Sequence, residues 1–111
     1  KERFSNVFKH LIDNALHASK GADSPFVKII CEFSVNHAKI AIMDNGEGMT
    51  EEFIKSKLFK PFETTKGNAG MGLGAYDAKR FSEDSSGELV VESKIGEGTT
   101  FTLILPRSGI L

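Results

Sequence analysis

The chain has 111 residues, of which 40% are hydrophobic and 26% are charged, and its formal net charge is -1. This size and composition predict one globular domain with a hydrophobic core. The intermixed charges give no indication of a nucleic-acid partner or of a polybasic membrane anchor. The single cysteine allows no disulfide within the chain, which fits a reducing compartment.

The sequence contains no signal peptide and no apolar run of ~18 residues, so this segment is not expected to enter a membrane. It begins within a helical pattern and has no leader, from which we expect one domain of a longer protein.

The first expected element is a helix over residues 4–19, where apolar residues recur at i, i+3, i+4 and i+7. His10, Asn14 and His17 form a second stripe along one edge of that apolar face. This stripe is either a solvated flank or the sheltered edge of a ligand site. At a sheltered edge, the amide oxygen of Asn14 can bind Mg²⁺, which usually keeps several waters and takes substrate phosphates as further ligands.

Residues 27–34 and 39–44 alternate apolar and polar side chains, which predicts an antiparallel hairpin. Cys31 falls on the apolar side of the first strand and is expected to be a core residue rather than a reactive thiol.

The second of these strands continues into the sequence DNGEGM at residues 44–49. No alternating strand follows, so a hairpin turn is disfavoured; Thr50 instead resembles the N-cap of a short helix with two acidic residues in its first turn. Asp44, at the end of a buried strand and followed by glycines, is a candidate acceptor for an exocyclic amine such as that of adenine.

A glycine cluster, GMGLG at residues 70–74, opens a helix that is expected to run to about Phe81. Free backbone N–H groups and the positive end of the helix dipole suit a phosphate chain. The cluster also matches part of the dinucleotide-binding fingerprint, but a charged loop precedes it where that motif requires a strand. No Walker loop is present, because Gly-Lys-Ser/Thr occurs nowhere in the chain.

The remaining segments complete the expected fold. Ala75, Ala78 and Phe81 share one face of the glycine-led helix, and their size allows close packing on a sheet. Residues 89–93 and 100–105 alternate as two more strands. Helices and strands in this order predict a two-layer α/β sandwich, with helices on one face of a mixed, mostly antiparallel sheet.

Five motifs in order resemble the N, G1, F, G2 and G3 boxes of the catalytic ATP-binding domain of sensor histidine kinases. They are HLIDNA at 10–15, DNGEGM at 44–49, LFKPF at 58–62, GMGLG at 70–74 and GEGTTF at 96–101. The resemblance covers residues 1–111 as one domain and implies the Bergerat type of α/β sandwich. Residues 59–81 further resemble nitrogen-regulator-like kinases and the kinases that accompany exosortase systems.

The resemblance implies a site for ATP and Mg²⁺. Asn14 would coordinate Mg²⁺, Asp44 would accept from the adenine 6-amino group, and Thr99 would support a water beside Asp44. His17 takes the place of a phosphate-binding lysine found in many members of the family. The nucleotide-binding residues implied in this way are Asn14, His17, Asp44, Gly46, Gly48, Met49, Phe62, Thr64, Thr65, Lys66, Gly70, Met71, Gly72, Leu73, Gly74 and Thr99.

Residues 49–70 correspond to the ATP lid of the family, with Phe59 and Phe62 as a hydrophobic latch or as ordinary core residues. Lys66 and Lys60 are expected either to pair with phosphate oxygens or to be solvated surface charges. Because little apolar sequence surrounds the tip at residues 66–70, we expect that tip to be poorly ordered.

The implied function is to hold Mg·ATP and to donate its γ-phosphoryl group to a histidine on a separate phosphoacceptor domain, which then passes it to a response regulator. The parent protein is expected to be a homodimer anchored in the inner membrane, with this domain in the cytoplasm. None of His10, His17 and His37 is followed by the Glu and Pro pattern of a phosphoacceptor. The isolated chain is therefore expected to bind nucleotide without phosphorylating itself.

Two alternatives remain open. An ATP-hydrolysing module of the same superfamily would carry a glutamate one helical turn before Asn14, but His10 occupies that position and is the catalytic candidate within this chain. The second alternative is a nucleotide-binding docking module without chemistry, which would share the fold but not the transfer reaction.

Overall fold

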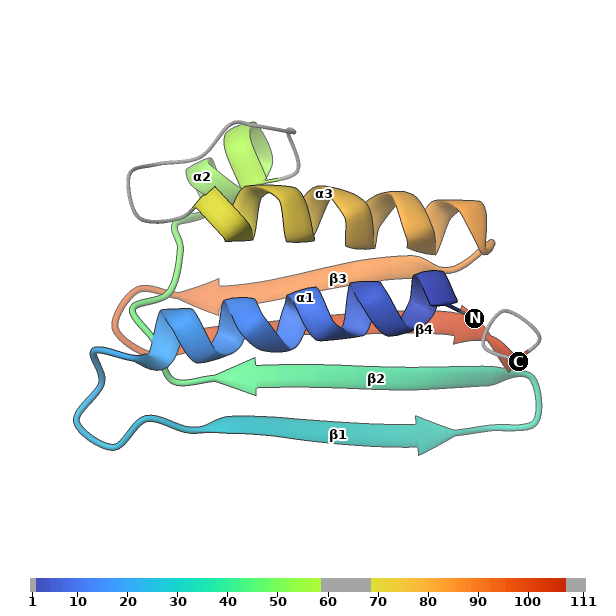
Figure 1. The fold of residues 1–111 in the computed structure, drawn as a ribbon, viewed down its shortest axis with the longest axis horizontal. Coiled ribbons are helices and arrows are strands. Elements are labelled where there is room, and N and C mark those ends of the chain that lie inside the picture. Colours follow the sequence, from blue (N-terminus) through green and yellow to red (C-terminus); the bar gives the residue numbers. More distant parts are fainter. Residues whose placement is uncertain (1, 59–68, 108–111) are drawn as a thin grey trace.

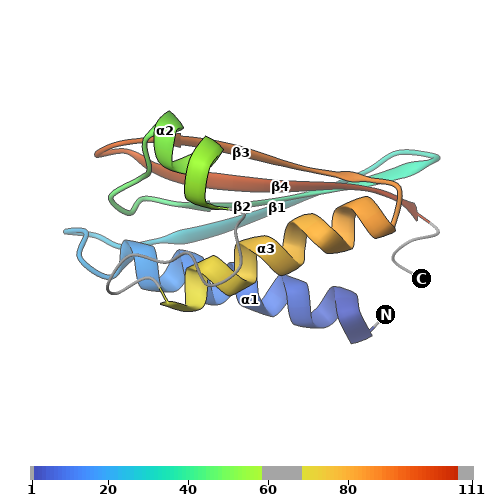
Figure 2. The same ribbon diagram turned by 90° about the horizontal axis from the view of Figure 1, so that it is seen from above.

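The computed structural model describes residues 2–58 and 69–107, which fold into two layers (Figure 1). One layer contains helix α1 (Glu2–Ser19) and helix α3 (Ala69–Asp84). The other layer is a four-stranded sheet, and Figure 2 shows both helices on the same face of it. This arrangement confirms the predicted two-layer α/β sandwich. None of the helices in the described residues is long and apolar enough to cross a membrane.

The sheet consists of β1 (Val27–Phe33), β2 (His37–Asp44), β3 (Glu88–Lys94) and β4 (Gly98–Pro106), in the order β1-β2-β4-β3. All three described strand pairs are antiparallel. The register places Asp44 of β2 opposite Thr99 of β4, and Thr99 opposite Ser93 of β3. Asp44 therefore forms one row, at a single end of the sheet, with Thr99 and Ser93, which lie far from it in the sequence.

The hydrophobic core lies between the helices and the two central strands, β2 and β4. It forms because alternate residues of each strand face the helices, while both helices present an apolar stripe at 3.6-residue spacing. The predicted α1 and α3 faces are confirmed. The buried core residues include Val7, Leu11 and Ala15 of α1, Ala75, Ala78 and Phe81 of α3, Ile42 of β2, and Phe101, Leu103 and Leu105 of β4.

A short helix, α2 (Glu51–Phe53), follows β2 and continues as a π-helical turn, η1 (Ile54–Leu58). Thr50 is its N-cap, as predicted, because its Oγ1 accepts a hydrogen bond of 3.0 Å from the backbone N–H of Phe53. Leu58 ends the turn fully buried and belongs to the core. The segment after β2 is thus anchored at both ends.

The prediction that Cys31 is a core residue is wrong. Cys31, Ile29 and Phe33 do share the face of the sheet that the helices cover, since the register places them opposite buried residues of β2. All three side chains are nevertheless exposed, Phe33 to 65%. β1 is an edge strand, and Figure 1 shows α1 lying over β2 and β4 rather than over β1. Alternation reveals which face a residue occupies, but not whether a helix covers that part of the face.

Candidate functional site

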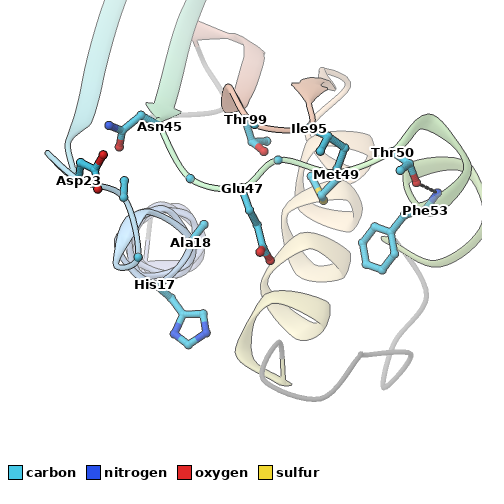
Figure 3. A pocket seen from close by; sticks show the side chains of 15 residues that line it. His17, Ala18, Asp23, Asn45, Glu47, Met49, Thr50, Phe53, Ile95 and Thr99 are labelled. Carbon is cyan, nitrogen blue, oxygen red and sulfur yellow. Dashed lines mark hydrogen bonds between the residues drawn. The ribbon is translucent and has the colours of Figure 1, made fainter.

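A cavity of about 770 Å³ lies at the end of the molecule where α1 ends and β2 runs into its loop. Its walls come from the end of α1, the loop after β2, the start of α2 and the β3–β4 turn (Figure 3). Five residues that the sequence singled out line it: His17, Gly46, Gly48, Met49 and Thr99. The fold therefore brings together residues from three separate stretches of the chain around one space of ligand size.

Asp44 lies directly behind this lining and is only 4% exposed. Its Oδ1 accepts a hydrogen bond of 2.8 Å from the backbone N–H of Gly46, which closes a tight local turn. Burial raises the pKa of the Asp44 carboxyl above its ordinary value of 3.8, while hydrogen bonds from the backbone of Gly46 and Thr99 act in the opposite direction. The site thus contains a desolvated carboxyl group held by backbone donors.

Asn45 connects the same loop to the chain before β1. Its Oδ1 accepts from the N–H of Phe26 at 3.0 Å, and its Nδ2 donates to the carbonyl oxygen of Ser24 at 2.9 Å. Sequence reasoning did not single out Asn45, which lines the cavity. Both bonds hold the wall of the cavity nearest to β1.

The glycines of the site allow backbone to lie against backbone. A Cβ added at Gly46 would collide with the carbonyl oxygen of Ala18, at the end of α1. At Gly48, which has a φ of +79°, it would collide with the carbonyl oxygen of Lys94. The loop after β2 is consequently pressed between α1 and the β3–β4 turn, and side chains are excluded from both contacts.

Hydrogen bonds add to this packing. The N–H of Gly96 donates to the carbonyl oxygen of Glu47 at 2.8 Å, and the N–H of Met49 donates to Ser93 Oγ at 2.7 Å. Ser93 Oγ also lies 2.7 Å from Thr99 Oγ1. Sequence reasoning missed Ser93, although a polar residue in an otherwise apolar inward-facing series (Leu89, Val91, Ser93) was a signal that could have found it.

Asn14 is buried, with 6% of its surface exposed, one helical turn before Ala18 of the cavity wall. Its Nδ2 has no hydrogen-bond partner. A buried amide without a partner is costly in a folded protein, and it is typical of a group that a ligand completes. No cluster of three or more His, Cys, Asp or Glu side chains suited to a metal occurs within residues 2–58 and 69–107.

Within the described residues, the remaining predicted site residues are not among those that line the cavity. Gly70–Gly74 lies in the first two turns of α3, which begins at Ala69. Figure 1 shows that this end of α3 and the end of α1 lie at the same end of the molecule. His10 is exposed on α1. The predicted lid residues Phe59, Lys60, Phe62, Thr64, Thr65 and Lys66 lie outside the described residues.

Comparison with known protein families identifies one match that extends over nearly the whole chain. Residues 1–109 match the model of the histidine kinase-, DNA gyrase B- and HSP90-like ATPase family. The match includes every segment that lines the cavity.

Two curated relatives are sensor kinases. The chain is 36% identical over 104 residues to sporulation kinase E of Bacillus subtilis, covering 94% of this chain and 14% of that protein. It is 31% identical over 110 residues to sensor protein SrrB of Staphylococcus aureus, covering 96% of this chain and 18% of that protein. The chain thus spans less than a fifth of either relative.

Solved structures share the fold. The nucleotide-free catalytic domain of histidine kinase ThkA is similar with a TM-score of 0.78 and 27% identity, covering 95% of this chain and 67% of that one. Full-length ShkA in complex with AMPPNP has a TM-score of 0.78 at 21% identity, covering 94% of this chain and 21% of that one. At that identity, the ShkA comparison supports the fold alone.

Proposed function

The chain belongs to the histidine kinase-, DNA gyrase B- and HSP90-like ATPase family, and on that premise we propose that it binds Mg·ATP as the catalytic domain of a sensor histidine kinase. The observation that carries the proposal is the cavity at the end of α1, behind which the buried carboxyl group of Asp44 lies. Its relatives among sensor kinases favour phosphoryl transfer over hydrolysis.

The adenine ring would lie in the cavity against the loop that follows β2. Asp44 would accept a hydrogen bond from the 6-amino group, directly or through a water held by Thr99. Met49 and Ile95 supply apolar surface to the cavity lining, which suits a flat ring. The close backbone contacts at Gly46 and Gly48 hold this wall in place before the nucleotide arrives.

The phosphates would point toward the start of α3, which lies at the same end of the molecule as the end of α1. The free N–H groups and positive dipole at a helix start favour phosphate oxygens. Asn14 would bind Mg²⁺ through its Oδ1, while its buried Nδ2, which has no hydrogen-bond partner, would donate to a phosphate oxygen. Bound Mg²⁺ would neutralise negative charge on the phosphate oxygens.

We further propose that the chain presents the γ-phosphoryl group to a histidine on a separate domain of its parent protein. The contribution of this chain to catalysis is then positioning and electrostatic stabilisation. A cytoplasmic location, a dimeric parent anchored in the inner membrane and a response regulator as downstream partner belong to the same proposal, which the sensor-kinase relatives support.

Calorimetric titration of a non-hydrolysable ATP analogue tests this function. We expect the wild type to bind, Asp44→Asn to bind about tenfold to hundredfold more weakly through loss of a charged hydrogen bond, and Asn14→Ala to lose the Mg²⁺-dependent part of the affinity. Asp84→Asn is the matched control, since it removes an exposed carboxylate at the other end of α3. A folded wild type that does not bind would refute the proposal.

A further inference from the structure

Three contacts meet at the hydroxyl group of Ser93. The N–H of Met49 donates to Ser93 Oγ at 2.7 Å, and this oxygen lies 3.0 Å from the carbonyl oxygen of Gly98 and 2.7 Å from Thr99 Oγ1. A serine hydroxyl carries one proton and two lone pairs. The three contacts therefore use its full hydrogen-bonding capacity.

The direction of the bond between Ser93 and Thr99 follows from the number of protons. The carbonyl oxygen of Gly98 can only accept, so its contact requires the single proton of Ser93. Thr99 then donates its own proton to Ser93, and all three contacts are hydrogen bonds. With the reverse direction, the contact with Gly98 would have no proton and one bond would be lost, which is unfavourable at a partly buried site.

The direction of the hydrogen bond between Thr99 and Ser93 determines whether Thr99 Oγ1 can donate or only accept toward the cavity. Its proton points toward Ser93, so the part of Thr99 Oγ1 that faces the cavity carries only lone pairs. Asp44, opposite Thr99 in the β2–β4 register, is also purely an acceptor in its carboxylate form. Figure 3 shows Thr99 beside the loop that carries Glu47 and Met49. This end of the cavity therefore accepts hydrogen bonds and donates none through these side chains.

We propose that Ser93 is a positioning residue that makes the cavity selective for purines with a 6-amino group, because it holds Thr99 Oγ1 as an acceptor. A 6-amino group donates hydrogen bonds to such a wall, whereas a 6-oxo group would present its lone pairs to those of Thr99. Ser93 is not among the residues that line the cavity, so it acts through Thr99 and through the backbone of Met49. This inference rests on the proposed nucleotide-binding function.

The test compares non-hydrolysable ATP and GTP analogues by calorimetry in the wild type, Ser93→Ala and Ser93→Thr. In Ser93→Ala, the Thr99 hydroxyl can rotate and donate, so we expect ATP-analogue affinity to fall about fivefold to tenfold while GTP-analogue affinity is unchanged or rises. Ser93→Thr keeps a hydroxyl at the same position and should restore the wild-type ratio. Ser93→Cys, which retains the volume of the side chain with a much weaker donor and acceptor, replaces Ser93→Ala if that variant does not fold.

Ser82→Ala is the matched control. Ser82 is buried near the end of α3, and its Oγ donates to the carbonyl oxygen of Lys79 at 2.7 Å, far along the helix from the cavity. It should lower the free energy of unfolding without changing the ratio of the two affinities. In a Thr99→Val background, Ser93→Ala should no longer change that ratio, because the hydroxyl through which it acts is gone.

The outcomes separate the inference from the function on which it rests. If the wild type binds the ATP analogue but Ser93→Ala weakens both nucleotides equally, or neither, the selectivity role is overturned and Ser93 only supports the fold. If the folded wild type binds no ATP analogue, the proposed nucleotide-binding function fails, and this inference fails with it. If the ratio of ATP-analogue to GTP-analogue affinity falls in Ser93→Ala and returns to the wild-type value in Ser93→Thr, both the nucleotide-binding function and the selectivity role of Ser93 are supported.

Discussion

At the scale of single residues, the burial of Asp44 has a cost that opposes the binding role proposed for it. Burial raises the pKa of its carboxyl, so the charged form that would bind an amine is the form that the folded chain disfavours. The N–H groups of Gly46 and Thr99 offset part of that cost by donating to the carboxyl group. A buried carboxyl group with a raised pKa beside a cavity is typical of a binding site.

This cost makes a prediction about pH. Because the pKa of Asp44 is raised in the folded chain, its contribution to stability is fully present below the ordinary value of 3.8 and is lost as the pH rises through the folded pKa. Asp44→Asn removes this titration. In denaturant unfolding, we therefore expect the stability of Asp44→Asn relative to wild type to increase as the pH rises from below 3.8 toward neutrality.

The same pH series on Asp77→Asn controls for the loss of one negative charge at an exposed position on α3. The prediction would be contradicted if the free energy of unfolding of Asp44→Asn, relative to wild type, stayed constant or decreased as the pH rises. Asp44 would then titrate without a desolvation cost.

At the scale of elements, the site depends on the contact between the loop after β2 and the β3–β4 turn. Two hydrogen bonds, from Gly96 to Glu47 and from Met49 to Ser93, join them. Gly48 lets the two backbones meet, since its φ is positive and a Cβ would collide with the carbonyl oxygen of Lys94. From the sequence, the glycines after β2 were predicted to leave room for a ligand beside the backbone. In the structure, Gly48 leaves room for the backbone at the end of β3.

Gly48→Ala tests this contact, with Gly96→Ala as its matched control. Both glycines have positive φ, of +79° and +85°, but a Cβ at Gly96 would meet nothing within 4 Å. Gly96→Ala should therefore lower the free energy of unfolding by about 1 kcal/mol, the cost of the left-handed conformation alone. Gly48→Ala should lower it by roughly 1–3 kcal/mol more, because the backbone must also move. Equal losses in urea unfolding would show that the backbone contact is unimportant.

At the scale of the whole molecule, two helices cover a four-stranded sheet unequally. α1 packs mainly on β2 and α3 mainly on β3, so the helix-facing side chains of the other edge strand, β1, are exposed. Ile29, Cys31 and Phe33 form this exposed row on β1. Because this row is exposed, a reagent in solution can reach the thiol of Cys31.

We expect Cys31 to react with a thiol reagent in the native chain at close to the rate measured in denaturant, because the folded structure leaves it exposed. The control is the double variant Cys31→Ser, Ala78→Cys, in which the single cysteine lies at a fully buried position of α3. Ala78→Cys should be protected until the chain unfolds. Strong native-state protection of Cys31 would mean that another surface covers β1 in solution.

The sequence by itself determined the elements and their faces, because periodicities of 2 and 3.6 residues are local properties. It also placed Asp44 at a strand end and Thr50 at a helix start, where short-range chemistry is decisive. The tertiary structure decided the rest. Strand register aligned Asp44, Thr99 and Ser93 in one row, and the lateral position of α1 left Cys31 exposed. Both depend on long-range packing, which no local pattern encodes.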